Sequence, residues 1–171
     1  MTVQNHGWSE EVHKGPWSPV YGLQRSTTVL KFGTTSRLPT EFVTLLAPLQ
    51  EVNLTPGRLL RMEGSDLVRG YRFEEGEVTH QFFFGQTGRP WVSGQVASDA
   101  AFVCLTTRQN QAADIIFSNG THVDWDGKQV AAAAQVVDRC EVINGEAVRI
   151  SCSDSSAITS SGISGREKTI R

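Results

Sequence analysis

Long apolar runs, an excess of one charge and a signal segment are all missing from this chain of 171 residues. No run approaches the roughly 20 apolar residues that a membrane-spanning helix needs. The chain has 16 Lys and Arg against 18 Asp and Glu, so no broad basic surface for nucleic acid or an anionic membrane is expected. The first residues lack the basic and apolar stretches of a secretory signal, and none is predicted. The sequence therefore predicts a soluble domain without nucleic-acid or membrane partners.

Cysteine is also scarce, and Cys104, Cys140 and Cys152 are too few for a disulfide framework. Cys140 and Cys152 flank a predicted hairpin around Asn144-Gly145. A three-residue loop would give this hairpin one apolar face that includes both cysteines. We expect the two to lie at least two residues out of register, beyond the Cα separation of about 7 Å that a disulfide tolerates. The prediction is therefore that all three remain buried thiols.

Turn signals and short alternating runs are abundant, and helical periodicity is scarce. Asn119-Gly120, Asp126-Gly127 and Asn144-Gly145 are dipeptides typical of hairpin turns. The runs between turns predict strands over 28–32, 41–47, 58–62, 68–73, 78–84, 100–106, 114–117, 121–125, 129–132 and 147–152. About ten short strands at this spacing indicate an all-β fold, an antiparallel two-sheet β-sandwich.

The composition also suggests where the domain begins and ends. Residues 1–14 are polar and are interpreted as an N-terminal extension. Residues 15–152 carry the strand pattern and form the predicted β-sandwich domain. Residues 153–171 are rich in Ser and Gly and form a polar C-terminal segment, in which isoleucines allow one more strand.

Four histidines, His6, His13, His80 and His122, are the candidates for chemistry, because no phosphate loop, Cys-x-x-Cys pair or nucleophile elbow is present. Alternation places His80 with Phe82 and Phe84, where a hydrogen-bonded histidine at the edge of the core is the favoured interpretation. His122 and Asp124 share one strand face, an arrangement suited to a metal or a proton relay. A surface hairpin with no such role is the favoured interpretation. No catalytic residue, metal ligand set or cofactor is assigned.

Aromatic side chains are the candidates for ligand binding, because sugars stack on flat rings. Trp91 follows a loop-like Arg-Pro pair, Trp125 stands next to a predicted turn, and Tyr71 lies in a strand. These three are the predicted carbohydrate-binding residues, and the two tryptophans are expected to be exposed. The alternative is that they fill the core between the two sheets.

One segment resembles a known family. The run Gly15-Pro-Trp-Ser-Pro-Val-Tyr-Gly22, followed by Leu38-Pro-Thr-Glu-Phe-Val-Thr-Leu-Leu-Ala-Pro48, resembles the C-terminal β-region of heparinase II/III-like polysaccharide lyases. Tyr21 matches the tyrosine of their Ser-x-x-Tyr-Gly segment, for which a structural role is expected. The later runs from Ser98 to Leu105 and from Ile115 to Gly120 are compatible with their closing strands.

The resemblance implies a β-sandwich that packs against a helical α/α toroid and takes part in the cleavage of uronic-acid polysaccharides, such as glycosaminoglycans, by β-elimination. No part of this chain resembles the toroid, which carries most of the family's catalytic residues. We therefore expect a non-catalytic module, inactive alone, that supports a helical catalytic domain of the same or an associated chain and contacts acidic glycan. An apolar face made for that domain would promote self-association.

Two other functions stay open. The chain could be a free-standing carbohydrate-binding module using the predicted aromatic residues. It could also be a small metal-dependent β-barrel enzyme using His80, His122 and Asp124. The polysaccharide and the cellular compartment are left open by the sequence, although the resembled family is often periplasmic or secreted.

Overall fold

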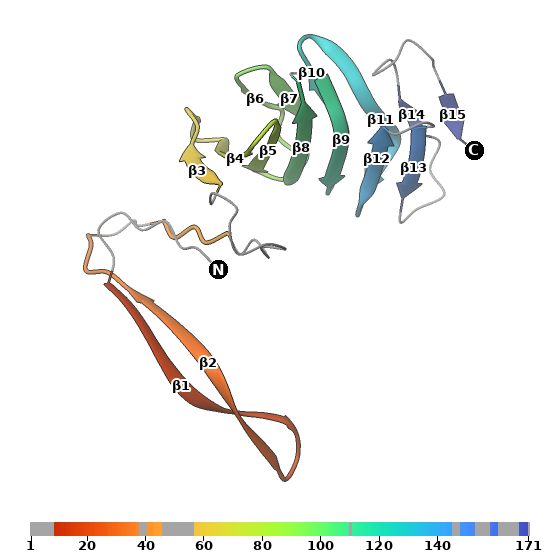
Figure 1. Cartoon of the computed structure of the whole chain (residues 1–171). Helices are drawn as coiled ribbons and strands as arrows, with labels where there is room; N and C mark the ends of the chain where they lie inside the picture. Colours follow the sequence, from red (N-terminus) through yellow and green to blue (C-terminus); the bar gives the residue numbers. More distant parts are fainter. Residues whose placement is uncertain are drawn as a thin grey trace. The chain divides into compact units, whose positions relative to one another are not determined.

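The structure, a computed structural model, contains only β-strands as regular elements in the residues that it describes (Figure 1). These residues are 9–37, 41–45, 57–109, 111–144, 148–152, 158–160 and 168–170. None of them belongs to a helix long and apolar enough to cross a membrane. Internal contacts divide the chain into two compact units, Met1–Leu54 and Thr55–Arg171, which are described separately.

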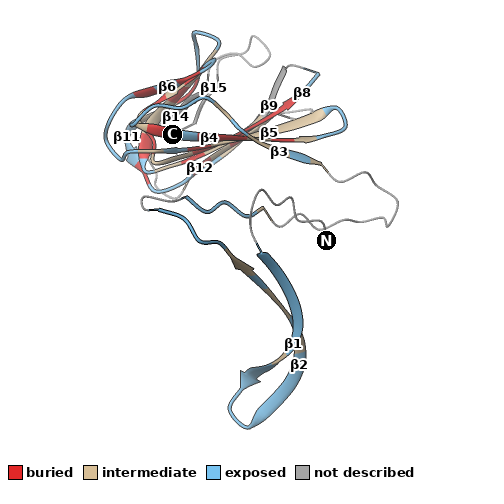
Figure 2. Cartoon of the chain, turned by 90° about the vertical axis from the view of Figure 1, so that its left-hand side faces the viewer, coloured by how far each residue is buried: buried red, intermediate tan, exposed pale blue. Residues whose placement is uncertain are grey.

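The first unit contains a long antiparallel hairpin of β1 (Ser9–Val20) and β2 (Leu23–Gly33). Val20 pairs with Leu23, so Tyr21 and Gly22 form the turn, and Gly22 supplies a positive φ of 78°. Most residues of this hairpin are exposed (Figure 2). The predicted boundary between residues 14 and 15 falls inside β1.

The strand predicted over 41–47 is not observed where the structure describes it. Residues 41–45 lie in no strand, and residues 46 and 47 lie outside the described residues. A β-like run becomes a strand only when a neighbour supplies backbone hydrogen bonds. In the described part of this unit, the sheet consists of β1 and β2, and its strand ladder does not include 41–45.

The second unit is built from two antiparallel sheets. One has seven strands in the order β13-β12-β9-β8-β5-β4-β3. Its strands are β3 (Arg58–Arg61), β4 (Val68–Glu75), β5 (Val78–Gly85), β8 (Phe102–Arg108), β9 (Gln111–Ser118), β12 (Cys140–Asn144) and β13 (Val148–Cys152). The other has six strands in the order β15-β14-β11-β10-β7-β6. These are β6 (Trp91–Ser93), β7 (Val96–Ser98), β10 (Gly120–Trp125), β11 (Lys128–Val137), β14 (Ile158–Ser160) and β15 (Lys168–Ile170).

The core of this unit takes side chains from both sheets. Phe83, Leu105 and Phe117 of the seven-stranded sheet are fully buried in one cluster with Val123 and Ala131 of the six-stranded sheet. On the strands that supply these residues, alternating positions point into this cluster, as the period of two requires. The predicted all-β, antiparallel sandwich is confirmed. Each strand predicted between residues 58 and 152 corresponds to an observed one, and β12 is the first strand of the hairpin predicted between Cys140 and Cys152. The structure adds β1, β6 and β7, and the C-terminal segment contains two short strands, β14 and β15, where one was allowed.

Two of the three predicted turn dipeptides form different connections. Asp126 and Gly127 have φ values of 52° and 71° and join β10 to β11 by a two-residue hairpin, because Trp125 pairs with Lys128. The hairpin predicted at Asn119-Gly120 is wrong. There the chain passes from β9 in one sheet to β10 in the other.

Three such crossovers meet at one end of the sandwich: β7 to β8, β9 to β10 and β11 to β12. Backbone hydrogen bonds join them, since Ala101 N lies 3.1 Å from the Ser118 carbonyl oxygen and Asn119 N lies 2.8 Å from that of Val137. We call this end, residues 98–101, 118–122 and 137–140, the corner.

The predicted register of Cys140 and Cys152 is also wrong. Cys140 pairs directly with Cys152, and Asn144 pairs with Val148, so the three-residue loop is present but brings the cysteines opposite each other. The physical reason is the loop length, since a three-residue loop between 144 and 148 aligns 140 with 152. All three cysteines are thiols. Cys140 is buried, whereas Cys104 and Cys152 are half-buried.

Candidate functional site

The outer side of the seven-stranded sheet carries a group of aromatic side chains that point away from the core. Phe83 and Val103 face inward and are fully buried, so their neighbours in β5 and β8 face outward. Register extends this face across adjacent strands, because Tyr71 pairs with Phe82 and Phe84 pairs with Phe102. We call the set Tyr71, Phe73, His80, Phe82, Phe84 and Phe102 the aromatic face.

His80 lies in the middle of this face. Its Nδ1 atom is 3.1 Å from Thr106 Oγ1 on the neighbouring strand. Its ring stacks between Phe73 and Phe82, at centroid distances of 6.3 and 6.4 Å. The structure therefore contains the hydrogen-bonded histidine that the sequence favoured, half-buried among aromatic rings.

Exposed guanidinium groups flank the rings. Arg61 pairs with Tyr71, and Arg69 pairs with Phe84, so both arginines share the aromatic face and both are exposed. Phe84 is 50% exposed and contacts Tyr71 edge-on and Phe102 at a tilt. A flat apolar ring beside a guanidinium is chemically suited to the ring face and the carboxylate of an acidic sugar.

The three predicted sugar-binding residues do not come together. Trp91 is 2% exposed and stacks on Phe83 inside the core, with its Nε1–H donating to the Ala100 carbonyl oxygen at 2.8 Å. Its predicted exposure is therefore wrong, because the indole found a hydrogen-bond partner inside the fold. Tyr71 lies on the aromatic face but is 6% exposed. Trp125 is half-buried at the end of β10, in the other sheet.

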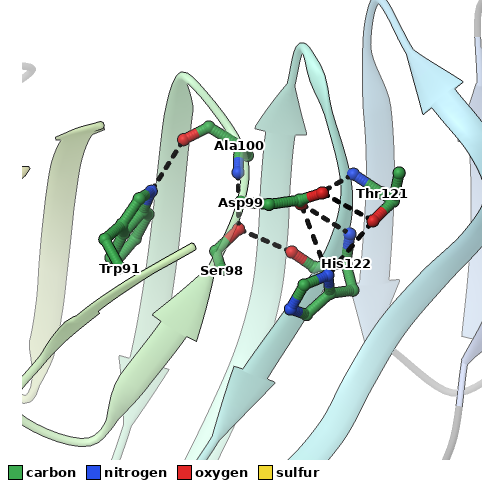
Figure 3. Close-up of polar contacts among 6 residues, drawn as sticks. All are labelled: Trp91, Ser98, Asp99, Ala100, Thr121 and His122. Carbon is green, nitrogen blue, oxygen red and sulfur yellow. Dashed lines mark hydrogen bonds and ion pairs between the residues drawn. The ribbon is translucent and has the colours of Figure 1, made fainter. Parts of the chain in front are cut away.

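A second cluster is built at the corner around Asp99, on the connection between β7 and β8 (Figure 3). Asp99 Oδ1 accepts from the backbone N–H of Thr121 at 2.8 Å and of His122 at 3.2 Å. Asp99 Oδ2 accepts from Thr121 Oγ1 at 2.7 Å. Ser98 Oγ donates to the His122 carbonyl oxygen at 2.5 Å and accepts from Ala100 N at 3.0 Å. These bonds tie the crossover between the sheets to the start of β10.

Donor counting assigns the tautomer of His122. The Thr121 hydroxyl uses its only proton on Asp99, so at the 3.1 Å contact with His122 Nδ1 it must accept. Nδ1 therefore carries a proton, and it also lies 3.4 Å from Asp99 Oδ1. The Nε2 atom is then the ring's acceptor when His122 is neutral.

The ionised form of Asp99 is stabilised by its neighbours. Burial acts to raise its pKa, but hydrogen bonds from Thr121 and His122 and the charge of His122 outweigh it, and the pKa of Asp99 is lowered. The Asp99 side chain is 17% exposed. The carboxylate thus acts as a charged hydrogen-bond acceptor that holds two strands together.

The ligand set considered for a metal is not assembled. His80 lies on the seven-stranded sheet, whereas His122 and Asp124 lie on β10 in the six-stranded sheet. Among the described residues, no group of three or more His, Cys, Asp and Glu side chains is placed to hold a metal ion. His122 and Asp124 share a face as expected, yet the carboxylate that contacts His122 is Asp99. His6 lies outside the described residues, and His13 is exposed on β1.

Sequence reasoning missed Asp99 and the two arginines of the aromatic face. Asp99 is 23 positions from His122, and no local spacing signals such a contact. The arginines could have been found from alternation, since Arg69 and Tyr71 are two apart on one strand. No family model matches the chain, and no curated protein matches it.

Proposed function

We propose that the chain is a non-catalytic β-sandwich module, like the C-terminal β-region of heparinase II/III-like polysaccharide lyases, that supports a helical catalytic domain and contacts acidic glycan. The observation that carries this proposal is the end of the β1–β2 hairpin. Trp17, Val20, Tyr21 and Leu23 are 53%, 61%, 106% and 40% exposed. We call these four residues the hairpin tip.

Large exposed apolar side chains such as those of the hairpin tip suit a protein interface. The hairpin does not need them for its own folding. A two-stranded ribbon has little interior, so large side chains at its end gain nothing from its own folding. Exposed aromatic and aliphatic residues grouped in seven positions are typical of surfaces that bind another protein. Trp17 and Tyr21 also belong to the segment that carries the resemblance, which favours a helical domain of such a lyase as the partner.

Glycan contact is proposed for the aromatic face. Phe84 offers an exposed ring, its cross-strand neighbour Arg69 offers a cation, and Arg61 offers a second cation opposite Tyr71 on the same face. This surface favours contact with an acidic glycan over a neutral one, because guanidinium groups pair with carboxylates. The aromatic face replaces the set Trp91, Trp125 and Tyr71 as the predicted place of contact.

The partner proposal can be tested with an α/α-toroid domain of a heparinase II/III-like lyase, expressed as a separate chain. Titration by calorimetry or interferometry is expected to show binding to the full chain. The double variant Trp17→Ser, Tyr21→Ser should lose most of it, since aromatic anchors dominate interfaces. Val92→Ser is the matched control, because Val92 is 66% exposed but lies in the sandwich. If the double variant bound the toroid domain as tightly as the unmutated chain does, a role for the hairpin tip would be refuted.

Activity and self-association provide two further tests. The chain alone, incubated with uronic-acid polysaccharides, is expected to give no ultraviolet-absorbing unsaturated product. Formation of that product would show a complete active site and overturn the proposal. Sedimentation should show concentration-dependent self-association that the double variant reduces, and a strict monomer at every concentration would count against an exposed docking surface. Glycan binding without any toroid binding would favour the free-standing carbohydrate-binding module.

A further inference from the structure

Cys140 and Cys152 stand opposite each other on neighbouring antiparallel strands, β12 and β13. Directly paired residues in such a ladder have Cα atoms about 4.5 or 5.5 Å apart. Both values lie within the range of about 4.4 to 6.8 Å that disulfides show. The two side chains also point to the same side of the sheet, since Cys140 is fully buried in the core and Cys152 packs against that core.

We propose that Cys140 and Cys152 are a redox-active dithiol that closes to an intramolecular disulfide when the chain meets a disulfide oxidant, such as oxidised glutathione or a thiol oxidoreductase. Register alone makes the pair competent, without movement of either strand. Cys104 is excluded from it by the fold. Cys104 lies between the inward-facing Val103 and Leu105, so its thiol is on the opposite side of the sheet.

The reaction would begin at Cys152. Cys152 is half-buried, whereas Cys140 is 0% exposed, so an oxidant reaches Cys152 first. The Cys152 thiolate attacks one sulfur of the oxidant disulfide, that S–S bond breaks, and one oxidant thiol leaves. Cys140 then loses its proton and attacks Cys152 Sγ, which releases the second oxidant thiol. In total the two cysteines give up two protons and two electrons, and the oxidant disulfide becomes two thiols.

The surroundings make the second step the slow one. Burial, together with the hydrogen bond and charge of Cys152, raises the pKa of Cys140. A thiol held protonated is a poor nucleophile, because the thiolate is the form that attacks. The pair is therefore expected to stay reduced in a reducing buffer and to respond to oxidant gradually.

The disulfide would act on the edge of the sheet. β13 is the end strand of the seven-stranded order, with β12 as its neighbour. A cross-strand bond would fasten this edge and reduce its local opening. Oxidation therefore changes the exposure of one sheet edge and leaves the rest of the sandwich unchanged.

The test uses the full chain in buffers of rising oxidised-to-reduced glutathione ratio. Samples are quenched with acid, alkylated in denaturant and digested with trypsin, which cuts after Arg139, Arg149 and Arg166. The expected result is that Cys140 and Cys152 lose alkylation together, and that peptides 140–149 and 150–166 appear cross-linked, with the mass of two hydrogens lost. Cys104 should stay alkylated in the same samples.

Three outcomes would overturn the proposal: full alkylation of both cysteines at the highest ratio, a glutathione adduct on Cys152 that never resolves, or a link between two chains. In Cys152→Ser, Cys140 should remain fully alkylated at every ratio. Hydrogen exchange of residues 148–152 in the unmutated chain gives a second readout, independent of whether the variant folds. Exchange there should slow on oxidation, and unchanged exchange would contradict the fastening of β13.

Discussion

Replacement of Asp99 by alanine tests whether the corner is held by one carboxylate. Asp99 accepts from the Thr121 backbone, the Thr121 hydroxyl and the His122 backbone. Alanine removes all three acceptors at once and leaves these partly buried donors behind. The corner joins the two sheets, so its loosening is expected to lower the free energy of unfolding of the whole second unit.

The size of the effect follows from the contacts. A hydrogen bond to a charged group contributes about 1.5–3 kcal/mol, and a neutral one about 1 kcal/mol. The three bonds share one carboxylate that is 17% exposed, so water replaces part of what is lost. We expect Asp99→Ala to lower the free energy of unfolding by about 2–4 kcal/mol. Asp99→Asn should lose about half as much, because its amide oxygen still accepts from the Thr121 backbone.

The pH dependence has a definite sign. The pKa of Asp99 is lowered in the folded state from the ordinary value of 3.8, so its ionisation stabilises the fold above that value. The contribution is lost only as the pH falls through the lowered pKa. The difference between the unmutated chain and Asp99→Asn should therefore persist from pH 7 to about pH 5, and should shrink below pH 3.8.

Urea unfolding followed by tryptophan fluorescence and circular dichroism measures these differences, because Trp91 is buried in the same unit. Asp138→Ala is the matched control, since Asp138 is an exposed aspartate at the same corner. It should change stability by no more than about 0.5 kcal/mol. If Asp99→Ala were no more destabilised than this control, the corner would not depend on the carboxylate. A difference that vanished already near pH 6 would assign the effect to another group.

Three further predictions concern two substitutions and the reactivity of one thiol. Gly120→Ala would place a Cβ 2.4 Å from Ala100 Cα, so a loss of about 2 kcal/mol or more in urea unfolding is expected, and an unchanged midpoint would contradict this crowding. Trp91→Phe removes the bond to the Ala100 carbonyl and should cost about 1–3 kcal/mol in the same assay, whereas full stability would mean that the carbonyl finds another donor. Burial, followed by the charge of Asp114, raises the pKa of Cys104 to about 11. At pH 9 about 1% of it is then thiolate, so alkylation of Cys104 in the folded chain should be far slower than in urea, and equal rates would refute this protection.

Alternation in the sequence was sufficient to predict most of the longer strands of the second unit and the faces of their side chains. His80, Phe82 and Phe84 were grouped correctly because residues two apart on a strand share a side. The short strands β6 and β7 were missed because three residues, Trp91–Ser93 or Val96–Ser98, show too little of a period. Exposure of Trp91 was predicted from its loop-like flank, and its burial depends on Phe83 and Ala100, which a local pattern does not connect.

Asp99 was missed because its contacts are with residues far along the chain. Asp99 meets Thr121 and His122 because β7 and β10 are paired and the next connection changes sheet. A sequence pattern indicates the strands but not which strands pair. Asp124, two residues from His122 on the same strand face, was therefore the natural partner to predict for His122. The Cys140–Cys152 register was different, since the loop length determined it and correct counting would have found it.

The two Asx-Gly turns show why identical local signals give different structures. At Asp126-Gly127 both residues have positive φ, and glycine is there for its backbone freedom, as a two-residue hairpin requires. In the Asn119-Gly120 pair, Asn119 has a positive φ and Gly120 does not. Gly120 is needed for space instead, since the backbone of Ala100 lies where a Cβ would be. The dipeptide therefore predicts that the chain bends. Whether the chain returns in the same sheet or crosses to the other depends on the strand that packs against the bend.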